Sequence, residues 1–257
     1  MKQNTSILTS QLLSEMGVVH GFTTRLGGVS KGVFSSLNFS FKVGDLDQAV
    51  EANRLLWERI TGLGWKNVVE LNQVHGSEVL VVDEPLWSLD PLEHRSFDAC
   101  VTCRQGAVLA ISTADCVPIL LYSQSPKAIG AVHAGWRGTI AGVAKKAVTT
   151  MVERLGCHAA GIHAVIGPCI HFSAFSVGPD VYKSFEDAFG PRSVGMENRE
   201  FHVDLVESNR LALVGVGLFE ESIQVLDYCT FSDENLFYSH RRDHGKTGRH
   251  LSYISLV

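Results

Sequence analysis

The sequence predicts an α+β protein with many strands. Three observations predict this class. Short apolar runs bounded by turn-forming residues recur along the chain, and such runs are typical of strands. A few longer stretches repeat apolar residues at helical spacing. Strands and helices do not alternate regularly, and this irregular order argues against a doubly wound parallel sheet.

The first third of the chain predicts strands around one helix. A glycine-rich loop, RLGGVSKG at 25–32, follows the first strand, and glycine adopts positive φ there without strain. The helix is predicted over residues 47–60, with an acidic first turn and with Val50, Leu56 and Ile60 near one face. The turn NQVHG at 72–76 places His75 between two strands. The strands are predicted at 18–24, 68–71 and 78–82.

The middle of the chain predicts four more strands and a helix. The second and third strands are apolar on consecutive residues, which predicts that both of their faces are covered. The helix begins after Gly138, carries apolar residues at helical spacing from Ile140 to Leu155, and ends at Gly156. The four strands are predicted at 98–102, 107–112, 117–122 and 128–132.

The last third predicts two strands, at 162–166 and 223–226, and two helices. Pro179 suits the first position of one helix. Asp204 and Glu207 form a capping box for the other, which runs to about Val214. The tail from Cys229 is polar and arginine-rich. Because no repeat or linker-like stretch is found, we expect one domain over residues 1–257.

Composition narrows the classes of protein and of partner. Of the 257 residues 45% are hydrophobic and 19% are charged, as in ordinary globular proteins. A net charge of −5 gives no basic field for nucleic acid, and no apolar run approaches the roughly 18 residues of a membrane span. The start of the chain lacks the apolar core of a signal peptide. With its six cysteines, the protein is therefore expected to be cytoplasmic with reduced thiols.

His75, Cys116 and His133 are candidate metal ligands. Each ends a strand-like run and stands beside a glycine or an acidic residue. Their spacing is too long for a zinc finger, but it suits three ligands brought by separate strand ends to one rim. Catalytic zinc uses three such protein ligands and keeps a fourth position open. The spacing alone leaves open that Cys116 is a small core residue and that the histidines are hydrogen-bonded loop residues.

Several arginines are candidates for binding an anion. Arg137 lies just ahead of the helix expected to start near Thr139, and a helix N-terminus presents free N–H groups. Arg25 in its glycine-rich loop, and Arg241 and Arg242 in the tail, offer bidentate contacts to phosphate. The alternative is that these arginines are surface groups or ion pairs.

Two other features allow two interpretations. Trp136 either stacks on a flat ligand or fills the core beneath its loop. Cys100 and Cys103 form a CxxC pair, but it starts on a predicted strand, where side chains three residues apart point to opposite faces. We therefore expect no metal or redox site at this pair.

Several short segments follow one another along nearly the whole chain: TTRLGGVS (23–30), SLN (36–38), VGD (43–45), NQVHG (72–76), TADC (113–116), AVHAGWRG (131–138), IGPCI (166–170), CT (229–230), FYSHRR (237–242) and TGR (247–249). Together these segments and their order resemble the YfiH-like laccase-domain family, also described as multicopper polyphenol oxidoreductases or purine nucleoside phosphorylases. The one departure is HFSAF at 171–175, where relatives often carry a glycine and paired cysteines.

The resemblance implies a fold and an activity. The fold is a layered α/β sandwich with mixed β-sheets, the YfiH-like cysteine hydrolase fold. The activity is phosphorolysis of adenosine, inosine, guanosine and methylthioadenosine, together with deamination of adenosine. The metal is Zn²⁺, held by His75, Cys116 and His133, with Cu²⁺ as the alternative. Copper-dependent phenol oxidation and editing of peptidoglycan precursors are the family's other assignments.

The residues favour activity on purine nucleosides over copper-dependent phenol oxidation. A copper oxidase needs a second, histidine-rich cluster for oxygen, and the chain has no His-x-His pair. The catalytic set is then His75, Cys116 and His133, with Asp115 transferring a proton or supporting a ligand. We expect the nucleoside and phosphate to be bound by a further set of residues: Arg25, Asn38, Gln73, Arg137 and Arg241.

Two other functional classes stay open. One is a peptidoglycan-precursor hydrolase with Cys116 as nucleophile, which tightly bound zinc would oppose because coordination engages the sulfur lone pair. The other is a binding module that zinc merely stabilises, and that chelation would unfold. The partners expected are small molecules rather than nucleic acid or membrane, with the chain a monomer or a weak homodimer.

Overall fold

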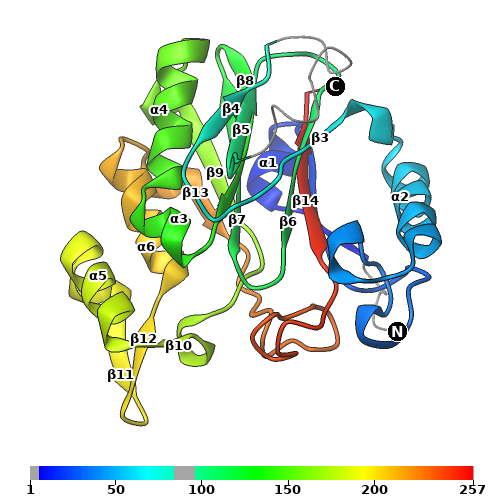
Figure 1. Ribbon diagram of the computed structural model, residues 1–257. Coiled ribbons are helices and arrows are strands. Elements are labelled where there is room, and N and C mark those ends of the chain that lie inside the picture. Colours follow the sequence, from blue (N-terminus) through cyan, green and yellow to red (C-terminus); the bar gives the residue numbers. More distant parts are fainter. Residues whose placement is uncertain (1–5, 84–95, 257) are drawn as a thin grey trace.

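Two mixed sheets pack face to face, with helices on their outer faces (Figure 1). The computed structural model describes residues 6–83 and 96–256. The six-stranded sheet has the order β13-β9-β7-β8-β5-β4, and the five-stranded sheet has the order β1-β2-β14-β6-β3. This arrangement confirms the predicted layered sandwich of mixed sheets.

The six-stranded sheet is built around the antiparallel pair β7 and β8. Along β7, Ile119 and Leu121 face the helices, whereas Leu120 and Tyr122 lie between the sheets. Both faces are covered, so the run is apolar on consecutive residues, as predicted. The strands are β4 (Val79–Val81), β5 (Ala99–Thr102), β7 (Val117–Gln124), β8 (Lys127–Ala134), β9 (Ile162–Ile166) and β13 (Ile223–Val225).

The five-stranded sheet has the last strand of the chain at its centre, between β2 and β6. This strand was missed in the tail, which the sequence analysis described only as polar and arginine-rich. Ser252 and Ser255 are nevertheless buried, because both faces of β14 are covered: Ile254 packs in the core between the sheets, and Tyr253 packs on the opposite face against Trp57. The strands are β1 (Ile7–Leu8), β2 (Val19–Thr23), β3 (Val68–Glu70), β6 (Val108–Thr113) and β14 (His250–Ser255).

Three helices, α3 (Trp136–Ile140), α4 (Val143–Leu155) and α6 (Leu205–Gly215), cover the six-stranded sheet. The single helix expected after Gly138 is in fact two. It begins earlier, at Trp136, and it breaks at Gly142, whose φ is +77°. Arg137 therefore lies inside a short helix and not ahead of a long one.

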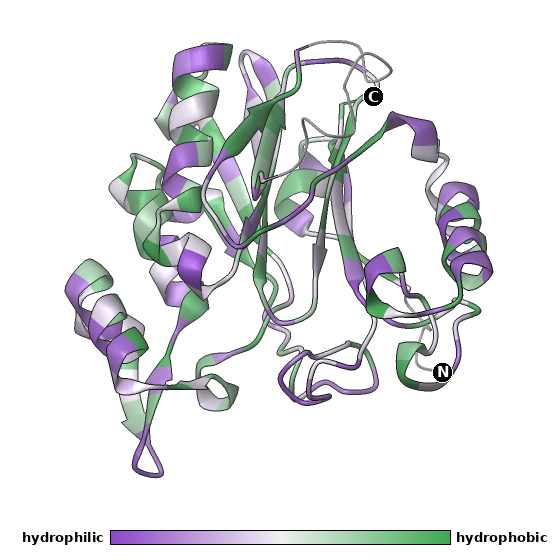
Figure 2. Cartoon of the chain, in the orientation of Figure 1, coloured by the Kyte–Doolittle hydropathy of each residue, from purple (hydrophilic) through white to green (hydrophobic). Residues whose placement is uncertain are grey.

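Helix α2 (Asp47–Thr61) covers the outer face of the five-stranded sheet, close to its predicted bounds. Its buried face was predicted correctly only at Val50, which is buried together with Asn53 and Trp57, whereas Ile60 is 55% exposed. Asn53 is polar but belongs to the inner face because its amide binds the loop at 30–38. Figure 2 shows the matching pattern, with hydrophilic residues on the outward side of this helix.

A three-stranded sheet, β10 (Ser176–Val177), β12 (Glu200–Val203) and β11 (Val194–Glu197), projects from the core beside α5 (Pro179–Phe189). Pro179 opens α5 as predicted. Asp204 caps α6 through the Glu207 amide, but the Asp204 amide donates to the Ser193 carbonyl instead of to Glu207. Only half of the predicted capping box forms.

Two smaller observations complete the fold. Helix α1 (Gln11–Glu15) buries Leu13 in the core between the two sheets. In the described part of the chain, none of the helices combines the length and the apolar character that crossing a bilayer requires. The first five residues, part of the stretch in which no signal peptide was predicted, lie outside the described residues.

Candidate metal centre and its cavity

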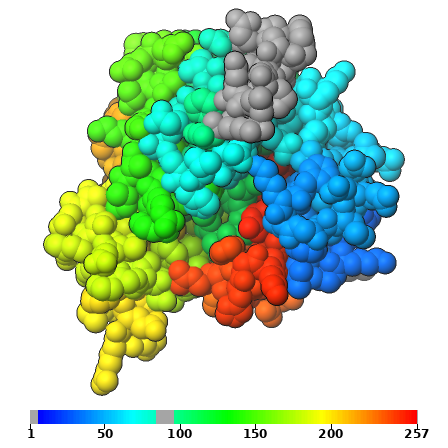
Figure 3. All heavy atoms as spheres, viewed as in Figure 1, coloured from blue at the N-terminus to red at the C-terminus, as the bar shows by residue number. Residues whose placement is uncertain are grey.

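A cavity of about 1060 Å³ lies at one edge of the two sheets, where β3, β6 and β8 end and where β7 and β14 begin. Its walls come from distant parts of the sequence, around residues 40–43, 70–75, 112–116, 133–137 and 240–249. In the space-filling view, the blue, cyan, green and red segments meet at this face (Figure 3). The volume is sufficient for a ligand of nucleoside size.

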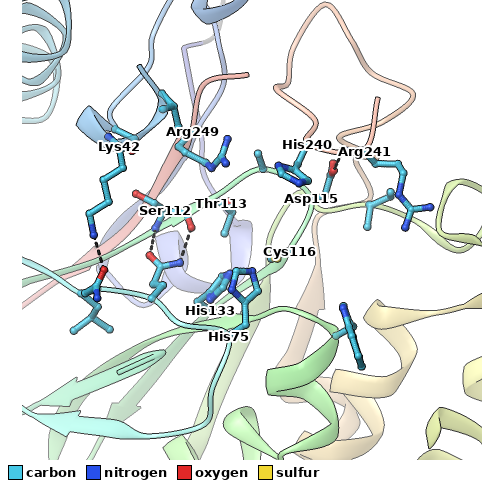
Figure 4. A pocket seen from close by; sticks show the side chains of 18 of the residues that line it. Lys42, His75, Ser112, Thr113, Asp115, Cys116, His133, His240, Arg241 and Arg249 are labelled. Carbon is cyan, nitrogen blue, oxygen red and sulfur yellow. Dashed lines mark hydrogen bonds between the residues drawn. The ribbon is translucent and has the colours of Figure 1, made fainter. Parts of the chain in front are cut away.

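His75, Cys116 and His133 lie together in this cavity, as the sequence predicted (Figure 4). One donor atom from each lies within 4.8 Å of the others. His75 and Cys116 belong to connections that cross from the five-stranded to the six-stranded sheet, and His133 lies on β8. The folding of the sheets against each other therefore assembles the cluster.

Asp98, which the sequence analysis did not single out, connects the cluster from behind. It is fully buried, and its Oδ1 lies 2.7 Å from His133 Nδ1. The same carboxylate accepts hydrogen bonds from the backbone amides of Val74, His75 and Gly76. One side chain thus orients one histidine and fixes the loop that carries the other. The only sequence signal was an acidic residue at the start of a strand.

The backbone around the cluster is closely constrained. His75 and Asp115 have φ values of +60° and +92°, in the left-handed region that non-glycine residues seldom occupy. Gly135 has an ordinary φ, but a Cβ there would lie 2.8 Å from His75 Cδ2 and 3.1 Å from Cys116 Sγ. Glycine is therefore required at this position by close approach to two of the three candidate ligands.

The electrostatics of the cluster favour a thiolate. Burial alone would raise the pKa of Cys116, but His133 and His75 outweigh it and lower that pKa. Burial alone would lower the pKa of His133, but Cys116 and Asp98 raise it. Two imidazoles and a thiolate with one open side are a donor set that zinc accepts. The histidine–carboxylate contact at Asp98 is the support that zinc-binding histidines usually have.

The Asp115 carboxylate contacts the tail of the chain. One carboxylate oxygen accepts from the Thr230 hydroxyl at 2.7 Å, and the other accepts from the Arg241 amide at 2.7 Å. Both oxygens are thus engaged by residues of the tail. The two roles expected for Asp115, proton transfer and support of a metal ligand, stay predictions.

Arg137 and Arg241, two of the residues expected to bind substrate, line the cavity, each over an aromatic ring. The Arg137 guanidinium lies 4.3 Å from the centre of the Trp136 ring, and that of Arg241 lies 5.0 Å from the centre of the Phe175 ring. Arg241 also donates to the Ser176 carbonyl. Trp136 and Phe175 themselves line the cavity, so this wall offers flat, partly cationic surfaces to a ligand.

The structure corrects the roles expected of Arg25 and Asn38. Neither lines the cavity. The Arg25 guanidinium donates to the carbonyls of Ser35 and Glu234 and lies over the Tyr238 ring, so it ties the first loop to the tail. Asn38 is fully buried and hydrogen bonds backbone groups of Ser40 and Arg249 and the carboxylate of Asp45.

Gln73 reaches the cavity wall, but its amide is already engaged. Its Nε2 donates to the Ser112 carbonyl and its Oε1 accepts from the Ser112 amide, both at 2.7 Å. The side chain therefore holds the loop that bears His75 against β6, and its contact to substrate stays a prediction.

Sequence reasoning missed three cationic residues of the cavity: Lys42, Arg54 and Arg249. Arg54 is paired with Glu70 at 2.8 Å and stacks between Phe41 and Trp65. Arg249 belongs to a matching family segment in the tail, and that was its only signal. The CxxC pair is divided as expected, with Cys100 buried in β5 and Cys103 exposed.

Comparisons with known proteins agree with this geometry. Residues 19–257 match the family model described as multi-copper polyphenol oxidoreductase laccase. A Deinococcus radiodurans protein named purine nucleoside phosphorylase is 39% identical over 243 residues, which cover 94% of this chain and 90% of that protein. The Bacillus subtilis protein named purine nucleoside phosphorylase YlmD is 34% identical, covering 93% of this chain and 88% of that one.

A solved structure shares the fold throughout. The crystal structure of YlmD from Geobacillus stearothermophilus superimposes with a TM-score of 0.91 at 32% identity, covering 100% of this chain and 98% of that one. The resemblance to YfiH-like laccase-domain proteins that the sequence motifs indicated is thereby confirmed.

Proposed function

The chain belongs to the multi-copper polyphenol oxidoreductase laccase family, and from this premise we propose that it is a zinc-dependent enzyme of purine nucleosides. It phosphorolyses adenosine, inosine, guanosine and methylthioadenosine, and it deaminates adenosine. One observation carries the proposal: the cluster of His75, Cys116 and His133 lies in a nucleoside-sized cavity with cationic and aromatic walls. The names of the relatives support the same class of reaction.

Zinc would be held by His75, Cys116 and His133, with Asp98 fixing the ring orientation of His133. Zinc in such a set supplies a Lewis acid and activates water near neutral pH. The thiolate form of Cys116, which the two histidines favour, is the form that binds a metal.

The two reactions make different demands on the same cavity. In phosphorolysis a phosphate oxygen bonds to ribose C1′, and the electron pair of the C1′–N9 bond leaves with the purine, giving the base and ribose 1-phosphate. In deamination water replaces the amino group at C6, giving inosine and ammonia. Trp136 and Phe175 offer the faces on which a purine stacks, and Arg137 and Arg241 supply donors beside them.

A copper oxidase is less well supported than its family name suggests. Such an enzyme needs a second, histidine-rich metal cluster besides the first. Over residues 6–83 and 96–256, the triad is the one group of three or more His, Cys, Asp or Glu side chains spaced to hold a metal.

The decisive experiment is to incubate the purified protein with adenosine, with and without phosphate, to separate the products and to measure bound metal. We expect adenine and ribose 1-phosphate only with phosphate, inosine in both cases, and about one zinc per chain. Cys116→Ala should remove the zinc and lower both rates more than about 100-fold, whereas Cys103→Ala, an exposed control, should retain them. Absence of all three products, with Cys116→Ala unchanged from wild type, refutes the proposal.

A second candidate function has its own supporting observation. Cys116, His133 and Asp98 have the order of a nucleophile, a base and an orienting acid, as in thiol hydrolases. In this hypothesis the Cys116 thiolate attacks an amide carbonyl carbon of a peptidoglycan precursor, and the C–N bond breaks as the amine leaves with a proton from His133. Water then hydrolyses the thioester, which releases the acid and restores the thiolate. Alkylation by iodoacetamide separates the two, because bound zinc protects the sulfur. Activity that survives with full zinc occupancy and disappears on chelation rules out the thiol hydrolase.

A further inference from the structure

We propose that Arg249 and Lys42 form a subsite for inorganic phosphate on the wall of the cavity that the five-stranded sheet supplies. The inference rests on the proposed function, and it specifies where the second substrate binds. It also replaces Arg25, which the sequence suggested for this role and which does not line the cavity.

The charge of the cavity favours an anion. Five cationic side chains line it, against two carboxylates, although the whole protein carries a net charge of −5. The two carboxylates are already engaged: Glu70 pairs with Arg54, and Asp115 accepts from Thr230 and Arg241. A local excess of positive charge attracts anionic ligands into a concave site.

Of the two guanidinium groups on this wall, Arg54 is paired with Glu70, whereas Arg249 forms no ion pair with any described residue. Its Nη1 donates to the carbonyls of Thr247 and Gly248 at 3.0 Å each. Among the described residues, no carboxylate contacts the Arg249 guanidinium. Its other guanidinium nitrogens, Nε and Nη2, are not hydrogen bonded to these residues. Its side chain is only partly exposed, and burial lowers its pKa. A half-buried guanidinium with free donors is suited to bidentate binding of phosphate.

One buried amide positions both members of the subsite. Asn38 Oδ1 accepts from the Arg249 amide at 2.9 Å and from the Ser40 amide at 3.1 Å. Ser40 caps the short 3-10 helix Phe41–Val43, which carries Lys42. The Lys42 ammonium donates to Asn72 Oδ1 at 2.6 Å, so it too is held in place. Asn38 therefore fixes two cations that are 207 residues apart in the sequence (249 − 42).

The position of the subsite suits the reaction. Figure 4 shows Lys42 and Arg249 on one side of the triad, and His240 and Arg241 on the other. A purine stacked at the Arg241 side would leave the space between that side and Arg249 for its ribose. Phosphate at Arg249 would then face the ribose, where its oxygen must bond to C1′.

The test measures phosphate binding directly and without nucleoside. The metal-loaded protein is titrated calorimetrically with inorganic phosphate, at an ionic strength kept constant with chloride. We expect Arg249→Gln to weaken phosphate binding at least about 10-fold, because hydrogen bonds to a charged group are lost. The matched control Arg154→Gln removes the same charge from an exposed position on α4 outside the cavity, and should bind as wild type does.

Arg249→Lys keeps the charge and guards against a folding defect in Arg249→Gln. Since lysine lacks the paired donors, it should show an intermediate affinity. Wild-type phosphate affinity in both variants overturns the proposal. So does binding of adenosine monophosphate through Arg249 by a protein that does not bind free phosphate. Phosphate binding that requires Arg249, in a protein that cleaves no nucleoside, refutes the proposed function but leaves the subsite intact.

Discussion

Two parts of the cavity are built in different ways. We call the candidate metal ligands and Asp98 its floor, and the side that carries Lys42 and Arg249 its wall. On the floor, the Asp98 carboxylate is fully buried and binds His133 and three backbone amides. On the wall, Arg249 is partly exposed and finds only carbonyl oxygens. The floor therefore holds the candidate metal-binding atoms at fixed positions. The unpaired N–H groups of the wall can instead bind a ligand reversibly.

The difference also explains which residues the sequence revealed. The candidate metal ligands of the floor lie in short motifs, NQVHG, TADC and AVHAGWRG, whose chemistry can be recognised locally, whereas Asp98 lies outside them and only its contacts reveal it. In the sequence, Arg25 and Arg249 both lie in glycine-containing stretches and look equally suitable for binding phosphate. Only contacts in the folded protein distinguish the two arginines, because the Arg25 guanidinium donates to the carbonyls of Ser35 and Glu234 outside the cavity.

The largest effect is expected at Asp98. Replacing it with asparagine removes the charge opposite His133 and disturbs the acceptor of the loop that bears His75. We expect zinc affinity to fall about 10- to 100-fold, measured by competition with a chelator. Asp83→Asn, at an exposed position, is the matched control. Unchanged zinc affinity in Asp98→Asn would show that the floor does not depend on this carboxylate.

Gly135→Ala tests the close approach on the floor. The added Cβ would meet His75 and Cys116 at 2.8 and 3.1 Å, so one candidate ligand must shift. We expect about a 10-fold loss of zinc affinity, with the unfolding temperature of the metal-free protein little changed. Gly161→Ala provides the control, because a Cβ there meets nothing within 4 Å. Equal zinc affinity in the two variants would contradict the packing argument.

Low pH should lower the free energy of unfolding through protonation of His250, which lies beside Arg249. His250 follows Arg249 and accepts a hydrogen bond from the Tyr238 amide, and burial lowers its pKa to about 3. The unfolded chain has a histidine pKa of about 6.5 and takes up the proton first. Stability is therefore full above pH 6.5 and falls as the pH drops toward 3, by up to about 1.4 kcal/mol per pH unit.

Urea unfolding of wild type at pH 7.5 and pH 5 measures this dependence. His20, whose pKa burial also lowers, adds to it, so His250→Gln should flatten the slope without abolishing it. The exposed His158→Gln should keep the wild-type slope. A wild-type slope in His250→Gln would mean that His250 is not the titrating group.

The smallest effect is expected at Arg25. Arg25→Gln loses hydrogen bonds to the carbonyls of Ser35 and Glu234, which should lower the free energy of unfolding by about 1 kcal/mol. The KM for phosphate should stay within about twofold of wild type, because the side chain lies outside the cavity. A rise in that KM comparable with the effect of Arg249→Gln would return the phosphate site to the first loop.

The sequence by itself determined what local patterns encode. Runs of apolar residues predicted β7 and β8, helical spacing predicted α4, and a proline predicted the start of α5. The donor types at His75, Cys116 and His133 were also readable, because metal chemistry restricts which side chains can serve. The tertiary structure brings these three together, and their role as zinc ligands stays a prediction that metal analysis can decide.

The tertiary structure alone decided what depends on neighbours distant in the sequence. Ser252 and Ser255 are polar, yet β14 is the central strand of its sheet because β2 and β6 take up its backbone hydrogen bonds. Asp98 supports the cluster because it directly precedes β5, where its carboxylate contacts both His133 on β8 and the backbone of the loop at 74–76. Arg249 reached the cavity and Arg25 did not, because the direction of a side chain is set by packing and not by residue type.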